Sequence, residues 1–510
     1  MKKQSLIKGS LVLACAGILA KFLGLFFRWP LIMLIGDEGL GYYQMTYPLY
    51  MLFVAIAAGI PIAVSKLVSE KNALGRYEES FQVIKEALKV MVLLGIGTSI
   101  FLAVGGKFLL PFLKWDDKAY YSILGICLAP TLIGIITPIR GFFQGFQNMT
   151  PTAISQILEQ IGRVIVGVGL AYILIDKGIE YSAGGASFGA VAGAFVAALY
   201  LIPKYRKIKN SFKLGKIKGS HKIFMEIINI ALPISIGAAV GSVMGVIDSV
   251  LVPQKLLQAG FTGQEATVLY AQLTGKATVF TNIPMTLATA LAASIIPIIS
   301  ELYILKDKVQ VKQKIDTTMK LCMIVSIPCF LGLFFMAEPI MNLLFPGKAD
   351  GFMILKYLSI SVPFLVGTQI TTSILQGMGY YYRPVFHLFI GCILKVVLTM
   401  NLIPIRSLNI YGAVIATIIS YSLVLILNLL YMAKRFKYAP NIKDVIIKPI
   451  FASILMIGTV LYLYTQALKY SESNSISCLI AVFVGIIIYM ISLFVLKIFS
   501  VEEINGRLRN

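Results

Sequence analysis

The sequence RGFFQGFQNMTPTAISQILEQIGRV, residues 140–164, joins two long apolar segments through a short polar turn. Polar side chains in this stretch lie next to or inside segments that are apolar enough for a membrane. They are Gln144, Gln156, Glu159, Gln160 and Arg163. Polar groups in hydrocarbon cost free energy, so they are rare there and mark functional sites. We therefore expect part of the functional site in this stretch.

The same pattern returns 232 or 233 residues later. The matching residues are Pro130, Gln144, Gly145, Pro151 and Arg163, answered by Pro363, Gln376, Gly377, Pro384 and Lys395. A second correspondence joins YYQMT at 42–46 to YAQLT at 270–274. The chain is therefore predicted to be internally duplicated. Internal repeats in a polytopic membrane protein indicate a transporter whose substrate site lies at the repeat interface.

The composition is that of an integral membrane protein. Hydrophobic residues make up 58% of the 510 residues and charged residues 13%, and the mean hydropathy is +0.85. The apolar runs are about 20 residues long, which suits helices that cross a hydrocarbon core of roughly 30 Å. They show too little alternation for the strands of a membrane barrel. The expected fold is an all-α polytopic membrane protein.

Fourteen spans are expected, with a first lobe (1–203, spans 1 to 6), a basic linker (204–226), a second lobe (227–435, spans 7 to 12) and an addition (436–510, spans 13 and 14). The first span is read as uncleaved. The expected spans are roughly 8–35, 45–69, 81–110, 120–143, 152–175, 184–203, 227–252, 269–299, 317–337, 352–376, 384–404, 411–433, 446–468 and 476–498.

Lysine and arginine in the loops predict the orientation. Three rich clusters, at 204–222, 306–320 and 434–448, fall on one side of the membrane. The asymmetry predicts that both termini are cytoplasmic. It also accounts for most of the net charge of +22. Contact with anionic membrane lipids explains these loops better than binding to nucleic acid.

The six cysteines fall in apolar runs without CxxC spacing, so no disulfide framework or metal site is expected. Of the two histidines, His221 lies in a basic loop and His387 early in a span. Each is expected to be structural or solvated. No cofactor is expected apart from a coupling ion, Na⁺ or H⁺.

Positive charge predominates among the charges within spans. Those charges are Lys21, Arg28, Arg163, Lys276 and Lys395, against Glu159 and Asp248. Lys21 and Arg28 are seven residues apart and share a helix face. Two such cations suit an anionic ligand, phosphate in particular. The alternative for Arg28 and for Lys276 is a place at the membrane interface rather than in a cavity.

Two further sets of charges carry alternative interpretations. Glu159 and Arg163 are four residues apart, so they either form a structural ion pair in span 5 or lie at a cavity edge. Asp248 is the only carboxylate in span 7. It forms either a structural pair with Lys395 or Lys276, or an ion-coupling site.

GLGYYQMTYPLY (39–50), AGIPIAVSKLVSE (58–70) and PIRGFFQGFQNMTPTAISQILEQIGRV (138–164) together resemble the stage V sporulation protein B branch of the polysaccharide and lipid II flippases. That branch belongs to the multidrug, oligosaccharidyl-lipid and polysaccharide exporter superfamily. The resemblance implies two pseudo-symmetric lobes of six helices around a central cavity, with a lipid-facing groove formed by the last two helices. It implies no enzymatic activity.

The resemblance also implies the substrate and its site. The substrate would be an undecaprenyl-pyrophosphate-linked sugar such as lipid II, moved from the inner to the outer leaflet. Cations on spans 1, 2 and 8 line the cavity in relatives, and here Lys21, Arg28 and Lys276 match. Span 2 departs from the pattern, because Lys66 lies at its cytoplasmic end. Some relatives bind sodium through span 7, and our hypothesis is that Lys395 replaces that ion beside Asp248.

The expected function is therefore an alternating-access flippase for peptidoglycan precursors, with a role in spore cortex synthesis, working as a monomer. Four alternatives remain open. They are a flippase for another lipid-linked polysaccharide unit, an ion-coupled multidrug exporter, a membrane glycosyltransferase and a scaffold that transports nothing. An exporter of organic cations would need acidic or aromatic cavity walls. A glycosyltransferase would need exposed acids or a metal site.

Overall fold

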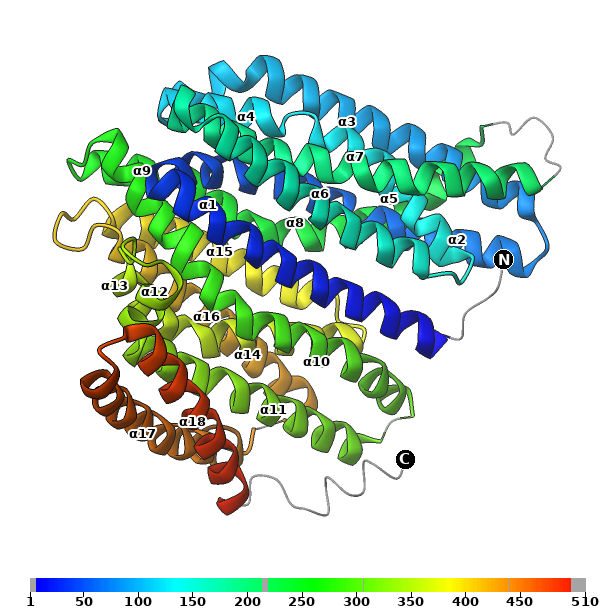
Figure 1. The fold of residues 1–510 in the computed structure, drawn as a ribbon. Coiled ribbons are helices and arrows are strands. Elements are labelled where there is room, and N and C mark those ends of the chain that lie inside the picture. Colours follow the sequence, from blue (N-terminus) through cyan, green and yellow to red (C-terminus); the bar gives the residue numbers. More distant parts are fainter. Residues whose placement is uncertain (1–5, 213–218, 306, 439, 497–510) are drawn as a thin grey trace. The chain divides into compact units, whose positions relative to one another are not determined.

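The described part of the chain is helical (Figure 1). The computed structural model describes residues 6–212, 219–305, 307–438 and 440–496, and no strand occurs in these ranges. The helices up to residue 271 are α1 (Leu6–Ala57), α2 (Gly59–Ala73), α3 (Tyr77–Leu113), α4 (Tyr120–Ile126), α5 (Ala129–Gly145), α6 (Thr150–Ile173), α7 (Ile179–Ser211), α8 (His221–Gln258) and α9 (Gly263–Ala271). Those after it are α10 (Thr278–Ile304), α11 (Lys308–Phe335), α12 (Ala337–Leu344), α13 (Phe352–Leu358), α14 (Val362–Gly377), α15 (Tyr382–Leu402), α16 (Tyr411–Phe436), α17 (Lys448–Ser471) and α18 (Asn474–Val495).

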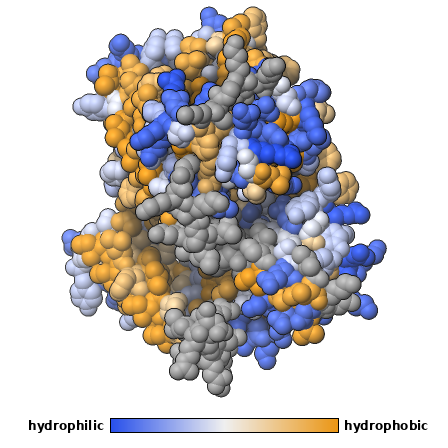
Figure 2. All heavy atoms as spheres, turned by 90° about the vertical axis from the view of Figure 1, so that its right-hand side faces the viewer, coloured by the Kyte–Doolittle hydropathy of each residue, from blue (hydrophilic) through white to orange (hydrophobic). Residues whose placement is uncertain are grey.

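The surface is that of a membrane protein. Twelve of the described helical segments are long and apolar enough to cross a membrane. α3, for example, exposes Phe101, Val104, Phe108 and Phe112, whose spacing places them on one side of the helix. Figure 2 shows apolar side chains in orange over much of the surface in view, beside hydrophilic ones in blue. The expected multi-pass, all-helical fold is confirmed.

The expected break between the first two spans is present at Gly36. The predicted gap at 36–44 is helical except at Gly36, whose φ of 63° lies in the left-handed region. Glycine adopts this conformation readily because it has no Cβ. Gly36 therefore separates two helical segments within α1, whereas Ala58, between α1 and α2, keeps helical dihedrals with a φ of −63° and a ψ of −28°. One candidate span, Cys15–Ala73, therefore covers both expected spans.

The duplication seen in the sequence is present in the fold. α5 follows the short helix α4, and α14 follows the short helix α13. Both α5 and α14 end in the same turn. The N–H of Gln147 donates to the Gln144 carbonyl at 2.9 Å, and the N–H of Gly379 donates to the Gln376 carbonyl at 2.9 Å. The φ of Gln147 is 55° and that of Gly379 is 87°, typical of a helix that ends in a left-handed residue.

The neighbours of these two helices also correspond. α5 packs against α2, α3 and α7, and α14 packs against α10, α11 and α16. α6 packs against α7 as α15 packs against α16. Each repeat thus builds the same arrangement around a helix that is interrupted near its start, α4 followed by α5 in the first repeat and α13 followed by α14 in the second.

Contacts divide the chain into two compact units at Ala271 and Gln272. α8 and α9 lie in the first unit, although the repeat assigns them to the second lobe. The Gly59 N–H donates to Ser235 Oγ at 3.2 Å, and Trp115 Nε1 donates to the Ser249 carbonyl at 2.8 Å. The lobe boundaries 203/204 and 226/227 describe the sequence repeat, and they stay a prediction.

Small residues bring α6 and α7 together. Gly185, Gly189 and Gly193 recur every four residues on α7 and so lie on one face. A Cβ on Gly189 would lie 2.7 Å from the Arg163 carbonyl oxygen, and one on Gly193 would clash with the Glu159 carbonyl oxygen. Such stripes let membrane helices approach closely. They position the part of α6 that carries Glu159 and Arg163.

The last two helices pack on the second unit. α17 lies against α18 and α11, and the Tyr489 hydroxyl on α18 donates to the Ile324 carbonyl on α11 at 2.7 Å. These helices have no counterpart in the first repeat.

Candidate functional site

Three tyrosines line one face of α1. Tyr43, Tyr47 and Tyr50 are four and three residues apart, so their side chains follow one another along the helix. The ring centroids of Tyr43 and Tyr47 are 5.5 Å apart, and those of Tyr47 and Tyr50 are 5.8 Å apart. α1 packs against α6. The tyrosine hydroxyls thereby meet the charged residues of α6.

Arg163 on α6 binds two of these tyrosines. Its Nη1 donates to the Tyr47 hydroxyl at 3.4 Å and its Nη2 to the Tyr50 hydroxyl at 3.3 Å. The side chain is buried, and its Nε has no hydrogen-bond partner among the described residues. A buried guanidinium with long bonds and an unused donor retains capacity for a further acceptor.

Glu159 is shared between two arginines. Arg140 Nη2 on α5 lies 2.8 Å from its carboxylate, and Arg163 Nη2 lies 3.8 Å from it. Arg140 also donates from Nε to Ser155 Oγ at 2.9 Å. The predicted Glu159–Arg163 pair is present, but the closer partner is Arg140. Two cations against one carboxylate leave this buried group with a surplus of positive charge.

Sequence reasoning treats Arg140, near the end of the expected span 120–143, as one of the cytoplasmic loop cations, so it does not find this role. α5 ends at Gly145, which places Arg140 more than one turn inside the helix. The turn before α6 then brings it opposite Glu159. The signal was the polar turn itself, since a helix that ends there must contain Arg140.

Arg28 belongs to the same region. It is half-buried on α1, and the Tyr43 hydroxyl lies within electrostatic range of both Arg28 and Arg163. We call this group the arginine–tyrosine cluster; its members are Arg28, Tyr43, Tyr47, Tyr50, Arg140, Glu159 and Arg163. Lys21 lies on α1, two turns before Arg28, and its side chain is outside the described residues.

Lys276 lies in the second unit, in a π-helical turn at Gln272–Ala277 that precedes α10. Its side chain is fully buried. Its Nζ donates to the Lys348 carbonyl at 2.7 Å and to the Asp350 carbonyl at 3.3 Å. In this conformation the ammonium stabilises the loop between α12 and α13. Its role as a substrate ligand stays a prediction.

Asp248 and Lys395 lie in different units. Asp248 is half-buried on α8 in the first unit, and Lys395 is buried on α15 in the second. Their predicted pairing, and that of Asp248 with Lys276, therefore stays a prediction.

The duplicated motif residues build turns. Gln144 and Gln376 supply the carbonyls of the two helix-ending turns described above, and Gly377 is the last residue of α14. A Cβ on Gly145 would lie 2.7 Å from that of Val68, so this glycine allows α5 to approach α2 closely. Pro151 and Pro384 lie in the first turns of α6 and α15, where proline is tolerated. The motif fixes the geometry that presents Arg140 and Glu159.

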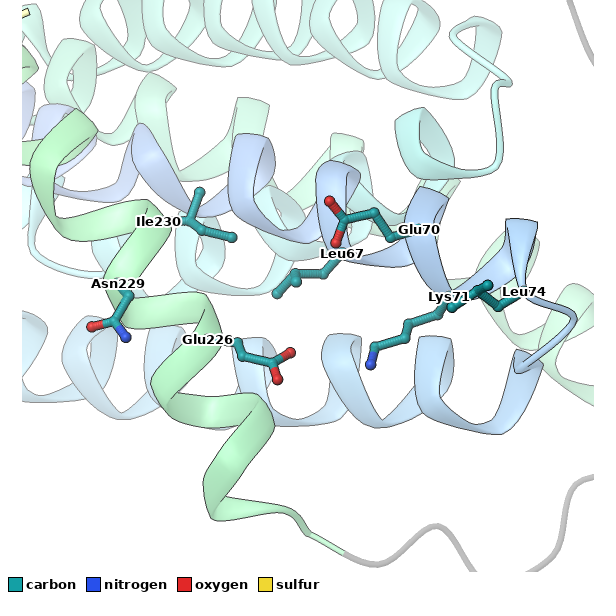
Figure 3. A pocket seen from close by; sticks show the side chains of 7 residues that line it. All are labelled: Leu67, Glu70, Lys71, Leu74, Glu226, Asn229 and Ile230. Atoms are coloured by element: carbon teal, nitrogen blue, oxygen red, sulfur yellow. The ribbon is translucent and has the colours of Figure 1, made fainter.

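A pocket of about 400 Å³ lies elsewhere in the first unit. Figure 3 shows its lining side chains, which come from the end of α2 and the start of α8. They are Leu67, Glu70, Lys71, Leu74, Glu226, Asn229 and Ile230. None of the predicted site residues lines it. Lys71 is already paired with Glu79 at 2.7 Å.

Comparison with known proteins assigns the chain to a family. The model of the polysaccharide biosynthesis protein family matches residues 6–303, more than half of the chain. The chain belongs to the polysaccharide biosynthesis protein family. The MatE model matches residues 274–400 of the same chain.

Its relatives cover nearly its full length. Stage V sporulation protein B of Bacillus subtilis is 29% identical, over 99% of this chain and 98% of the relative. Lipid II flippase MurJ of Bacillus subtilis is 28% identical, over 89% of this chain and 88% of the relative. The family resemblance drawn from the sequence motifs is confirmed.

Solved structures share the fold. A structure of the lipid II flippase MurJ in an inward closed conformation superposes with a TM-score of 0.72 at 17% identity, covering 94% of this chain and 98% of that one. An inward-facing multidrug resistance MATE family transporter of the MOP superfamily gives 0.69 at 15% identity, covering 82% and 94%. These proteins are named as a flippase and a transporter, not as enzymes.

Proposed function

We propose that this protein is a flippase that moves an undecaprenyl-pyrophosphate-linked sugar precursor, lipid II or a similar molecule, from the inner to the outer leaflet. Membership of the family and the names of its full-length relatives support a lipid-linked precursor. The observation that carries the proposal is the surplus of buried positive charge in the arginine–tyrosine cluster. An anionic headgroup is the ligand that such a surplus favours.

The physical problem is the pyrophosphate. It cannot cross hydrocarbon unaided, because burial of an uncompensated charge costs many kcal/mol. Guanidinium groups bind phosphate oxygens through two parallel hydrogen bonds. We expect the headgroup to pair with Lys21, Arg28 and Lys276. The surplus positive charge around Arg163 adds to the attraction. The polyprenyl tail stays in lipid beside α17 and α18, and the lobes rock around the site.

Lys276 enters this scheme only after a rearrangement. Its ammonium is bound to the carbonyl oxygens of Lys348 and Asp350 in the described conformation. In the proposal, phosphate oxygens replace these carbonyls when the loop moves away.

The cellular role follows as part of the proposal. The precursor serves peptidoglycan, and in particular spore cortex, synthesis. The protein resides in the cell membrane as a monomer with both termini cytoplasmic. Its basic loops contact anionic lipids, and it does not bind nucleic acid.

Export of drugs is the second candidate, favoured by the MatE match at residues 274–400 and by the fold of the MATE transporters. Organic cations would be repelled by the surplus positive charge beside α1. The cluster therefore favours the flippase.

The test is a flipping assay in reconstituted vesicles, in which fluorescent lipid II becomes accessible to an external reagent. We expect movement with the wild-type protein and its loss in the Lys21→Ala/Arg28→Ala double variant. A Lys66→Ala/Arg76→Ala variant removes two cations whose side chains are each 59% exposed, and it should retain activity. No movement with folded wild-type protein would contradict lipid II as substrate. Normal movement in the first double variant would contradict the site.

A further inference from the structure

A buried polar network joins three helices of the second unit. His387 on α15 shares a hydrogen bond of 2.8 Å between its Nδ1 and Asn428 Oδ1 on α16. Asn428 Nδ2 donates to Thr371 Oγ1 at 3.0 Å and to Thr372 Oγ1 at 3.3 Å, both on α14. Asn428 and Thr371 are fully buried, and 8% of His387 is exposed. We call these four residues the histidine junction.

The hydrogen bonds of the junction have a fixed direction. The hydroxyl of Thr371 donates to the Gly367 carbonyl at 2.8 Å, so its oxygen accepts from Asn428. The Asn428 amide nitrogen is therefore the donor to the threonines, and its oxygen accepts from His387. Nδ1 of His387 must then carry the hydrogen, and Nε2 keeps a lone pair. Nε2 takes no part in this bond, and its lone pair can bind a proton.

The first repeat holds different side chains at the positions equivalent to this junction. His387 and Thr372 correspond to Ser155 and Arg140, each 232 residues earlier. In the first repeat this place holds the Arg140–Ser155 bond and the Arg140–Glu159 ion pair. Arginine stays charged at every physiological pH, whereas histidine ordinarily changes charge near neutrality. The two repeats therefore carry a permanent charge and a titratable group at equivalent junctions.

The groups around His387 oppose a second positive charge. Arg383 lies one turn earlier on α15, and its guanidinium carbon is 5.6 Å from the Tyr431 ring. The His387 ring is 6.0 Å from the same ring. Arg435 on α16 donates to the Tyr380 hydroxyl at 3.3 Å, and the Tyr380 ring is 5.7 Å from that of Tyr431. The side chains that α14 contributes to the junction, Thr371 and Thr372, are neutral. A proton on His387 thus adds charge next to cations, and like charges one turn apart destabilise a helix.

We propose that the histidine junction is a proton-binding site that regulates flipping, with the proton held on His387 Nε2. The bond from Nδ1–H to Asn428 survives protonation, but the added charge lies one turn from Arg383 and so opposes the packing of α15 against α16. Looser packing of α15 slows the movement that carries the substrate, so the protonated form flips substrate more slowly. The regulation rests on the proposed flippase function, whereas the proton site does not.

The proton site can be tested without any transport assay. The chain contains two histidines, so a His221→Gln variant leaves His387 as the single reporter for ¹⁵N-histidine NMR in lipid nanodiscs. We expect a neutral ring with its hydrogen on Nδ1 at about pH 8, and protonation of Nε2 as the pH falls to about 5. A hydrogen on Nε2 at high pH, or an unchanged ring over this range, would overturn the proposal. Asn428→Leu in the same background should abolish the Nδ1 preference.

Regulation is tested by flipping in vesicles at defined pH. Wild type and His221→Gln should slow several-fold as the pH falls from about 7.5 to 6, within the range in which histidine ordinarily gains a proton. His387→Gln should lose this dependence. His221 is the matched control, because it is exposed at the start of α8. A pH-dependent rate in His387→Gln equal to that of wild type would refute regulation by this site. Titration of His387 without flipping in any variant would support the proton site while the proposed function fails.

Discussion

Glu159 lies between two arginines and so sets the net charge of the arginine–tyrosine cluster. Its carboxylate lies 2.8 Å from Arg140 and 3.8 Å from Arg163, and it is buried between them. Ionised, it neutralises one of the two arginines. The other charge stays available for an anionic ligand, and Arg163, with its unpartnered Nε, is the group placed to use it.

Replacing Glu159 by glutamine should destabilise the protein. The variant leaves the buried Arg163 and the half-buried Arg140 without a counter-charge, and the loss of one partner from a buried ion pair costs about 3–5 kcal/mol. Thermal unfolding of the purified protein in detergent measures the change.

Glu70→Gln is the control, because its carboxylate is 54% exposed and lies 3.9 Å from Lys66. Exposed pairs contribute at most about 1 kcal/mol. Equal shifts in the two variants would show that Glu159 is not a buried counter-charge.

At the scale of elements, the contact between α6 and α7 positions this charge. α7 presents a glycine every four residues, and the backbone of α6 lies directly on that stripe. Close approach is what lets a buried turn of α6 be held rigidly. The helix-ending turn after α5 then sets Arg140 against it.

Gly193→Ala should push the two helices apart at Glu159. Its new methyl group would meet the Glu159 carbonyl oxygen, and overpacking of this kind costs about 1–3 kcal/mol. We expect a lower unfolding temperature together with slower flipping.

Gly169→Ala on α6 is the matched control, because a Cβ there has nothing within 4 Å. Alanine is favoured over glycine inside a helix by about 0.5–1 kcal/mol. This variant should be as stable as wild type or slightly more so. If Gly193→Ala behaves in the same way, the close contact does not constrain the site.

For the whole molecule, two repeats of one design carry different chemistry. α5 and α14 end in the same turn. Near that turn the first repeat holds the charged residues Arg140 and Glu159, whereas the second holds His387. In the proposed function, motion of the repeats moves an anionic headgroup across the membrane. An inside-negative membrane potential acts directly on that charge.

Flipping should therefore accelerate under an inside-negative potential. Outward movement of an anion is favoured by about 2.3 kcal/mol per elementary charge per 100 mV. A potassium gradient with valinomycin sets the potential in vesicles, and accessibility of the fluorescent precursor gives the rate. The same gradient without valinomycin is the control. A flipping rate that does not change with the membrane potential would mean that no net charge crosses with the substrate.

The amino-acid sequence alone determined the helical membrane fold, the duplication and the family. Hydropathy sets where helices cross the membrane, and a repeat of Gln144–Gly145 at Gln376–Gly377 needs no knowledge of packing. The expected break after residue 35 corresponds to Gly36, the non-helical residue within α1, although the helix resumes directly after it rather than at residue 45.

Only the tertiary structure decided which side chains meet. The Arg140–Glu159 pair, the tyrosines around Arg163 and the His387–Asn428 bond each join residues from different helices. Hydropathy reports how apolar a segment is, but the partner of a polar side chain depends on how helices rotate and pack. His387 is expected from the sequence to be structural or solvated, and only the packing shows that its partner is Asn428, 41 residues away. Close packing between helices, which is absent from any local pattern, turns these separate residues into sites.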